Sequence, residues 1–361
     1  MKKLLAMTLV SAMAVSLAGC SGKSDSAATE AATTPAETKA AQTTEAKTDS
    51  AAPELIFKYA ELNSDDNINT KVGYKFAEYV DEMSEGRIKI EVYSASTLGD
   101  EKTCLNALQM GGGTVDMYRG NTNSLSDYGF KKLNMFGLPF IFTSRETMWK
   151  VLEDPDLGQA FLTEGSEVGA GMTGLFYMDE GARNLFTSKE IKGLDDIKNK
   201  KIRVPETALM MDTMSSLGAQ PTPISYSELY SSLQTGVVDG AENGLPGYTS
   251  NKFYEVAPYY LMSGHTFSPG IVMMAEAKWN ALSDDDKEIL LAAGQKASDW
   301  NKGEIASEET ALEKELENKG VTIIRMTPED KAKAQSACES VWADYTAGME
   351  DLLQKIVEIQ K

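Results

Sequence analysis

The sequence predicts an α/β fold built from two domains. Short apolar strands and amphipathic helices alternate from about residue 53 to the end. That span of roughly 310 residues is long enough for two domains of ordinary size. A capping serine, Ser283, also precedes a segment without proline until Pro328, in which Gly320 is a plausible stop and Gly294 and Gly303 are candidate sites of a bend or a break. This predicts a helix of about 35 residues, about 50 Å long, which would brace both domains.

Residues 1–19 have the pattern of an export leader. Lys2 and Lys3 precede an apolar run over residues 4–17, which is too short to span a bilayer. The tetrapeptide Leu17-Ala18-Gly19-Cys20 resembles a bacterial lipobox, in which the cysteine becomes the lipidated first residue. We therefore expect cleavage before Cys20 and a lipid anchor at that cysteine.

Residues 20–52 are predicted to form a disordered tether. They are nearly all Ser, Ala, Thr, Glu and Lys, without an aromatic residue. An unconstrained low-complexity tail is the plainer alternative. No later segment approaches 18 consecutive apolar residues, so we expect membrane attachment by the lipid alone, at the outer face of the cytoplasmic membrane or in the periplasm.

The first half of the folded part contains the elements that define the alternation. Strands are expected at 55–60, 88–92, 116–118 and 173–178, and helices at about 70–84, 100–110 and 145–153. The first helix is supported by Val72, Phe76, Val80 and Met83 at helical spacing. The segment 136–142 is too apolar for a surface loop, so we expect it to be buried.

Helix boundaries in the second half are indicated by capping residues. Ser225-Tyr226-Ser227-Glu228 fits a capping box that opens a helix ending at Gly236. Three acids follow Ser283 at the start of the long helix, where the helix dipole favours negative charge. Thr327 followed by Pro328 predicts the start of another helix.

Composition excludes several function classes. The net charge of −19 argues against nucleic acid as a partner. His265 is the only histidine, which excludes zinc sites that need several imidazoles and favours a structural or binding-cleft role for this residue. The sequence has no G-x-S-x-G nucleophile motif and no phosphate-binding glycine loop. We therefore expect no cofactor, no metal and no catalytic residue, and a binder is favoured over an enzyme.

Cys104 and Cys338 are expected to be buried hydrophobic residues. Export permits a disulfide, but two cysteines without a short spacing are more often unpaired.

Arg203 is the leading candidate for ligand binding. It lies at the end of a short apolar strand, between Ile202 and Val204, and Pro205 terminates this strand. A strand end is the usual ligand position in an open α/β sheet, and a guanidinium offers the planar donor fork that a carboxylate requires. An ordinary surface ion pair is the alternative for a single arginine.

The chain resembles the DctP-type solute-binding proteins of tripartite ATP-independent periplasmic (TRAP) transporters. The resemblance runs from about Leu55 into the C-terminal helices, and its fragments are weak alone but strong in their order and spacing. They are Gly86-Arg87-Ile88-Lys89-Ile90, Leu98-Gly99-Asp100, Leu138-Pro139-Phe140, Lys201-Ile202-Arg203-Val204-Pro205, Leu217-Gly218-Ala219, Leu233-Gln234-Thr235-Gly236 and Val238-Asp239-Gly240-Ala241-Glu242-Asn243.

This resemblance implies a two-lobed Venus-flytrap binder that captures an organic acid and delivers it to the small and large membrane subunits of a permease. It implies that Arg203 pairs with the ligand carboxylate, and that Arg183, Asn243 and Tyr226 also contact the ligand. The chain has Ala241 and Gly244 where the family commonly has Gln and Pro. These departures bear on the identity of the ligand.

Polar residues elsewhere suggest a hydroxyl-rich ligand. Arg119 follows the predicted strand 116–118, with Asn121 close behind it, and Asn63 follows the first strand. In a cleft, Arg119 would add a cationic contact from the other lobe. The combination suits a sugar acid, a uronate or an aldonate, better than a bare C4-dicarboxylate, which stays open as an alternative.

We expect lobe 1 to comprise residues 53–180 with about 269–308, and lobe 2 to comprise 181–268 with about 309–361. Ligand would close the lobes by touching both of them. Two other functions remain open: a sensor that presents its ligand to a receptor kinase, and a surface enzyme that acts on glycans through paired carboxylates.

Overall fold

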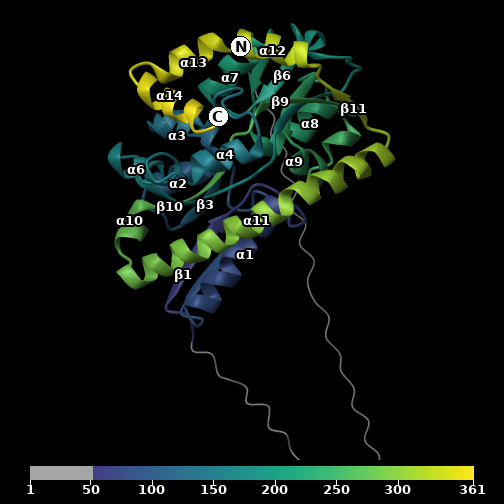
Figure 1. Cartoon of the computed structure of the whole chain (residues 1–361). Coiled ribbons are helices and arrows are strands. Elements are labelled where there is room, and N and C mark those ends of the chain that lie inside the picture. Colours follow the sequence, from purple (N-terminus) through teal and green to yellow (C-terminus); the bar gives the residue numbers. More distant parts are fainter. Residues whose placement is uncertain (1–51) are drawn as a thin grey trace, which may run out of the picture. The chain divides into compact units, whose positions relative to one another are not determined.

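The computed structural model describes residues 52–361, so the leader, Cys20 and the tether lie outside the described residues. The strands of the described part form two sheets (Figure 1). The five-stranded sheet has the order β2 (Ile88–Tyr93), β1 (Leu55–Ala60), β3 (Met117–Asn121), β10 (Gly270–Ala275) and β4 (Met172–Met178). The six-stranded sheet has the order β11 (Thr322–Arg325), β9 (Tyr259–Thr266), β5 (Arg183–Thr187), β8 (Gly240–Gly244), β6 (Lys201–Val204) and β7 (Gln220–Pro223).

Each sheet mixes parallel and antiparallel pairs. In the first sheet, β1 runs parallel to β2 and β3, whereas β10 is antiparallel to both β3 and β4. In the second sheet, β6 is parallel to β7 and β8, β9 is parallel to β11, and β5 is antiparallel to β8 and β9. The chain therefore crosses between the sheets by short segments after β4 and after β9, and once more through the long helix that precedes β11.

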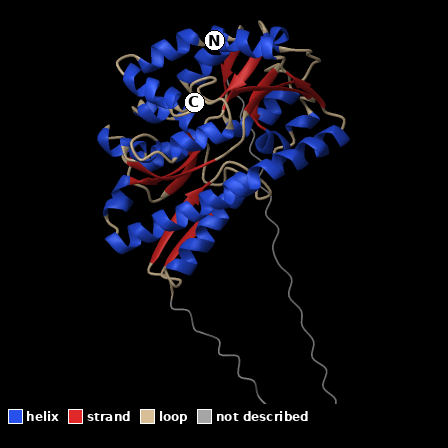
Figure 2. Cartoon of the chain, viewed as in Figure 1, coloured by secondary structure: helices blue, strands red, loops and turns tan. Residues whose placement is uncertain are grey.

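Helices cover the sheets and connect them (Figure 2). The helices before the second sheet are α1 (Ile68–Met83), α2 (Glu101–Gln109), α3 (Lys132–Met135), α4 (Arg145–Leu152), α5 (Gly158–Phe161) and α6 (Glu164–Glu167). The later ones are α7 (Ala208–Ser216), α8 (Leu229–Gln234), α9 (Leu245–Ser250), α10 (Glu276–Asn280), α11 (Asp284–Asn318), α12 (Pro328–Ala337), α13 (Glu339–Thr346) and α14 (Glu350–Glu358). Short 3-10 turns lie at Thr122–Ser124, Ser126–Tyr128, Leu194–Ile197, Tyr226–Glu228 and Phe253–Glu255.

The long helix α11 spans both sheets, as predicted (Figure 1). The Ser283 side chain accepts a hydrogen bond from the Asp286 backbone N–H and caps its start. Its first part packs on α1 and β4, and its later part packs on α9. Gly294 does not break the helix, and a Cβ at this position would collide with the Phe176 ring. This glycine therefore allows close packing.

Most predicted elements are confirmed to within a few residues, but one start signal was wrong. The Ser225 hydroxyl donates to the Glu228 carboxylate at 3.1 Å and caps no backbone N–H. A 3-10 turn follows at Tyr226–Glu228, and α8 begins only at Leu229. Asn243 lies in strand β8. The segment 136–142 is buried throughout, as expected.

The last helices contact parts of the chain that belong with both sheets. Val341 and Ile356 join the hydrophobic cluster that contains Leu105 and Phe136. The Trp342 indole N–H donates to the Pro139 carbonyl at 2.7 Å, while α13 also packs on α7 of the second sheet. The segment after 309 thus does not lie on the second lobe alone, and we propose that it fastens both.

Cys104 and Cys338 are both free and buried, so the expectation of unpaired cysteines is confirmed. They belong to two different hydrophobic clusters. Within residues 52–361, no helix combines the length and the apolar character that crossing a bilayer requires.

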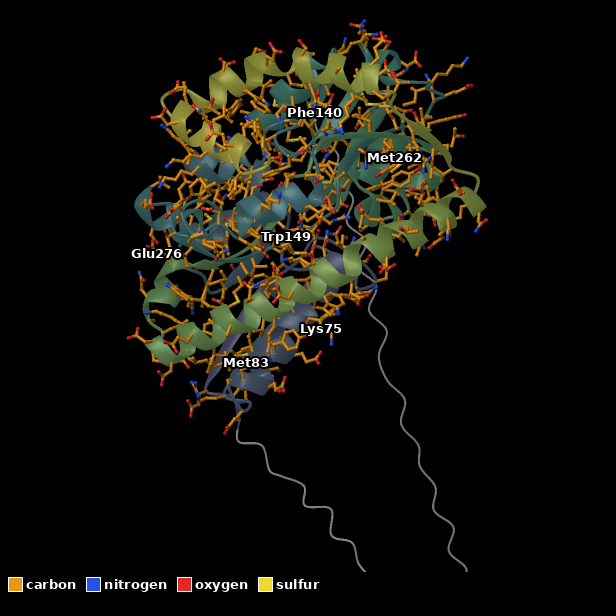
Figure 3. The ribbon with its side chains drawn as sticks, in the orientation of Figure 1. Lys75, Met83, Phe140, Trp149, Met262 and Glu276 are labelled. Carbon is orange, nitrogen blue, oxygen red and sulfur yellow. The ribbon has the colours of Figure 1, made fainter. Side chains whose placement is uncertain are left out.

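Figure 3 labels Met83 of α1 and Met262 of β9 in different parts of the molecule. Trp149 of α4 is labelled near α11. The Lys302 ammonium of α11 lies 4.6 Å from the centre of its ring. This contact is one of those that fasten the long helix to the first lobe.

Candidate functional site

The structure brings all seven predicted ligand-binding residues to one pocket. Arg203, Arg183, Asn243, Tyr226, Arg119, Asn121 and Asn63 line a narrow space of about 60 Å³. Asn63 lies in the loop between β1 and α1, and Arg119 and Asn121 lie on β3 of the first sheet. Arg183, Arg203 and Asn243 lie on β5, β6 and β8 of the second sheet, and Tyr226 begins the 3-10 turn after β7. A wider outer pocket of about 330 Å³ shares Arg203 and Tyr226 with the inner one. Arg203 therefore lies where the two spaces meet.

Arg203 occupies the third position of the four-residue strand β6. Its neighbours Ile202 and Val204 pack into a hydrophobic cluster on one face of the sheet, and alternation turns Arg203 to the other face. Its Nε donates to the Ile224 carbonyl at 2.7 Å. Its guanidinium carbon lies 5.7 Å from the centre of the Tyr226 ring. These contacts fix the guanidinium without neutralising it.

The charge of Arg203 has no carboxylate partner among residues 52–361, although only 3% of the residue is exposed. Burial lowers its pKa to about 10, against the opposing influence of Glu242 and together with that of Arg183. The residue is still a cation at neutral pH. Burying a cation without an acid partner costs free energy unless a bound anion pairs with it.

Arg183, in contrast, is neutralised by Glu242. The two side chains make a bidentate pair, with Nε to Oε2 at 2.5 Å and Nη2 to Oε1 at 2.7 Å. They lie diagonally across the antiparallel strands β5 and β8, on the same face. Burial opposes the charged forms of both residues, yet Arg183 and His265 hold the pKa of Glu242 at about 2, and Glu242 raises the pKa of Arg183.

His265 belongs to the support of this pair and does not line the pocket. It is fully buried, with its Nε2 3.4 Å from Glu242 and its Nδ1 2.9 Å from the Ser263 hydroxyl. The expectation of a structural histidine fits this position.

Arg119 is paired with two carboxylates. Its Nε donates to Glu61 at 2.8 Å, a second nitrogen also binds Glu61, and Nη1 donates to Glu180 at 2.8 Å. The other oxygen of Glu180 accepts from the Asn121 amide at 2.8 Å. Arg119 lies inside strand β3 and not after it. It lines the pocket with its charge paired to Glu61 and Glu180, and its cationic contact with the ligand stays a prediction.

The Tyr226 hydroxyl links the two lobes through hydrogen bonds to asparagine side chains. It donates to Asn63 Oδ1 at 3.2 Å and accepts from Asn243 and Asn251, each at 3.0 Å. Asn63 follows a strand of the first sheet, whereas Tyr226, Asn243 and Asn251 belong with the second. A second hydrogen bond of this kind joins Asn67 to Ser250 at 2.8 Å. The lobes are thus hydrogen-bonded to each other beside the pocket.

The four glutamates around the pocket were not predicted. Glu101 lines both pockets and accepts from the Tyr118 hydroxyl at 3.2 Å, and burial raises its pKa. Glu61, Glu180 and Glu242 pair with arginines. Of the four, only Glu242 could have been predicted from the sequence, because it directly precedes Asn243 in the family-like fragment Val238–Asn243.

This arrangement suits recognition of an anion that carries hydroxyl groups. The inner pocket is lined by amides, arginines and glutamates, and its lining includes no histidine or cysteine. Within residues 52–361, no group of three or more His, Cys, Asp or Glu side chains could hold a metal ion. One guanidinium edge is open to an anion, and amides and carboxylates around it can bind hydroxyl groups.

Comparison with known proteins gives the family. The model of the DctP family, bacterial extracellular solute-binding protein family 7, matches residues 59–348. A solute-binding protein of Roseobacter denitrificans OCh 114 is 31% identical over 307 residues, which cover 85% of this chain and 91% of that protein. Its structure, described as a TRAP periplasmic solute-binding protein with bound L-galactonate, matches with a TM-score of 0.78.

Two further solved structures are similar over the same region. A TRAP periplasmic solute-binding protein of Pseudomonas putida F1 with bound D-glucuronate has a TM-score of 0.78 and 28% identity, covering 83% of this chain and 96% of that one. Another, from Sulfurospirillum deleyianum with bound succinate, has a TM-score of 0.77 and 28% identity, covering 85% and 99%.

These matches confirm the predicted resemblance and the two-lobed α/β fold with its long helix. TRAP solute-binding proteins are extracytoplasmic, bind small carboxylates and work with membrane permease subunits. The chain belongs to the DctP family of bacterial extracellular solute-binding proteins, the binding subunits of TRAP transporters.

Proposed function

We propose that this chain captures a sugar acid, a uronate or an aldonate, outside the cytoplasm and delivers it to a TRAP permease. The observation that carries the proposal is Arg203, a buried guanidinium held by Ile224 and Tyr226 with no acid partner among the described residues. A carboxylate leaving water needs charge-assisted hydrogen bonds, and this guanidinium offers them in one plane.

The rest of the pocket supports a polyhydroxylated ligand. Asn121 and Asn243 present amides, and Glu180 presents a carboxylate that accepts hydrogen bonds. Similar proteins were solved with D-glucuronate and L-galactonate bound. Because another was solved with succinate, a C4-dicarboxylate is the alternative cargo.

Closure of the lobes would report that the site is occupied. The pocket is lined from both sheets, so a ligand held there adds contacts between the lobes to those of Tyr226 with Asn63. A permease that distinguishes the closed form from the open one would then receive only loaded protein. We propose that the chain acts in this way as a binder without catalysis.

The test is thermal unfolding of residues 53–361 with a panel of uronates, aldonates, C4-dicarboxylates, sialic acid and neutral sugars. A ligand at 100 times its dissociation constant adds about 2.7 kcal/mol of stability, which moves the midpoint by a few degrees. We expect shifts with sugar acids and none with neutral sugars. A panel in which no acid shifts the midpoint would contradict the proposal and favour the sensor or enzyme alternatives.

We further propose that the chain is anchored by a lipid on Cys20. The support is the sequence Leu17-Ala18-Gly19-Cys20 after the apolar run of the leader. The full-length protein should incorporate a labelled fatty acid in bacteria, and the Cys20→Ala variant should not. Equal labelling of the two proteins would contradict the anchor while leaving the binding proposal unaffected.

A further inference from the structure

The pocket contains three arginines, and their charges are not equivalent. Arg183 is matched by one glutamate, whereas Arg119 faces two, Glu61 and Glu180. The Arg119 cluster therefore carries a net negative charge, although its central residue is a cation. Glu61 is 1% exposed and Glu180 8%, so water screens this charge poorly.

Glu180 is the member of this cluster that meets the ligand space. It lines the inner pocket together with Arg203, whereas Glu61 lies behind it and is not part of the lining. Both oxygens of Glu180 are engaged, one by Arg119 at 2.8 Å and one by Asn121 at 2.8 Å. Its place is further restricted by β10, because a Cβ at Gly270 would lie 2.5 Å from its Oε1. The carboxylate cannot swing away easily.

The inner pocket is lined by Arg203 and by Glu180, Arg119 and Asn121 of the Arg119 cluster. An acid whose carboxylate binds Arg203 and whose chain occupies this pocket would bring its far end toward that cluster. A hydroxyl there can donate a hydrogen bond to a carboxylate oxygen. A second carboxylate has no proton to donate and meets a fixed like charge instead, and such juxtapositions cost several kcal/mol. Arg119 cannot compensate, because its positive charge is already balanced by two acids.

We propose that Glu180, supported by Glu61, determines the charge of the ligand: the site accepts an acid with one carboxylate and rejects the corresponding diacid. This inference rests on the proposed function and narrows it. It makes the C4-dicarboxylates and the aldarates poor ligands, and it assigns to the buried acids a role in specificity beyond holding Arg119.

The experiment compares ligands that share a carbon chain and differ only at one end. Titration calorimetry at pH 7.5 would measure D-gluconate against D-glucarate and D-galactonate against galactarate, with succinate added. In the better-bound series, the diacid should bind at least about 30-fold more weakly than the monoacid, which corresponds to about 2 kcal/mol. Equal affinities of the wild-type protein for monoacid and diacid would overturn the inference.

The Glu180→Gln variant tests the residue itself. The amide keeps the shape of the side chain and removes the charge, so the ratio of diacid to monoacid affinity should rise at least about tenfold. Glu206→Gln is the matched control, because Glu206 is an exposed acid of the outer pocket only. An unchanged ratio in Glu180→Gln, or an equal rise in Glu206→Gln, would contradict the role of Glu180.

A ligand-side test avoids any dependence on folding of the variant. The monoamide of the same diacid removes one charge from the ligand and should recover at least about tenfold in affinity for the wild-type protein. A monoamide that binds no better than the diacid would count against the inference even if Glu180→Gln does not fold. Failure of the wild-type protein to bind either aldonate, D-glucuronate or D-galacturonate would instead remove the proposed function, and the inference with it.

Discussion

Arg203 and Arg119 are two buried arginines of one pocket with opposite surroundings. Arg119, in β3 of the first sheet, is held by Glu61 and Glu180. Arg203, in β6 of the second sheet, is held by a carbonyl oxygen and an aromatic ring and has no acid partner among residues 52–361. Removing a buried arginine that is paired with acids leaves those acids without a cation and destabilises the fold, whereas a buried arginine without an acid partner is itself unfavourable. Two residues that look alike in the sequence are therefore distinguished by the partners that the fold gives them.

The largest expected effect is on ligand affinity. Arg203→Ala should weaken sugar-acid binding by about 10²–10³-fold or more, because the ligand carboxylate then stays buried without a partner. Titration calorimetry measures this loss directly. Arg203→Lys should retain part of the affinity, since it keeps the charge but loses the planar fork. Near-native affinity of a folded Arg203→Ala protein would remove this residue from the site.

The effect on folding stability, measured by unfolding in urea, should be larger for Arg119→Ala than for Arg203→Ala. Arg119→Ala leaves Glu61 and Glu180 buried without their cation and should lower the free energy of unfolding by about 3–5 kcal/mol. Arg203→Ala should leave the stability of the ligand-free protein unchanged or raise it, because burial disfavours that charge. A larger loss of stability in Arg203→Ala than in Arg119→Ala would contradict the comparison.

Lowering the pH should reveal how much the Arg183–Glu242 pair contributes to the free energy of unfolding. The pKa of Glu242 is depressed to about 2 in the folded protein, below its ordinary value of about 4.5. Its contribution is therefore fully present above about pH 4.5 and is lost as the pH falls toward 2, by about 3 kcal/mol at most. Urea unfolding from pH 5 to pH 2 measures the slope. Glu242→Gln should flatten that slope, and an unchanged slope would show that other groups control it.

The smallest expected effect concerns the contact between the lobes. Tyr226→Phe keeps the ring beneath Arg203 but removes a hydroxyl that bonds to Asn63, Asn243 and Asn251. A loss of about 1–1.5 kcal/mol would weaken ligand binding roughly 5- to 10-fold. Tyr230→Phe is the control, because that hydroxyl bonds to the surface residue Glu255. Equal effects of both variants would mean that the Tyr226 hydroxyl has no special role.

The sequence was sufficient for what depends on neighbouring residues. Alternation around Ile202 and Val204 indicated the strand that presents Arg203, and the cap at Ser283 indicated a helix of the observed length. The position of Arg203 near the end of a strand that Pro205 terminates predicts a ligand contact, and the structure places this residue in the pocket. These predictions depend on residues that are adjacent in the sequence, so they do not require knowledge of which distant segments pack together.

Whether acids neutralise the charges of the other two arginines could not be predicted in this way. Arg119 takes its partners from 58 and 61 residues away, and Arg183 takes its partner from 59 residues away. Which of the chain's many acids meets which arginine depends on the sheet order and on the crossings between the sheets. Ser225 shows the same limit at short range, since its hydroxyl bonds to the Glu228 carboxylate and not to the backbone.

The most direct test of the central claim is a cycle that changes the protein and the ligand together. D-Glucuronate and its uncharged amide would be titrated into the wild-type protein and into Arg203→Ala, or another uronate and its amide if that uronate binds better. If Arg203 binds the carboxylate, the Arg203→Ala substitution and the change from acid to amide should each weaken binding. Making both changes together should weaken binding little more than either change alone, which corresponds to a coupling free energy of at least about 2 kcal/mol. Additive losses, with a coupling free energy near zero, would show that the carboxylate is bound elsewhere.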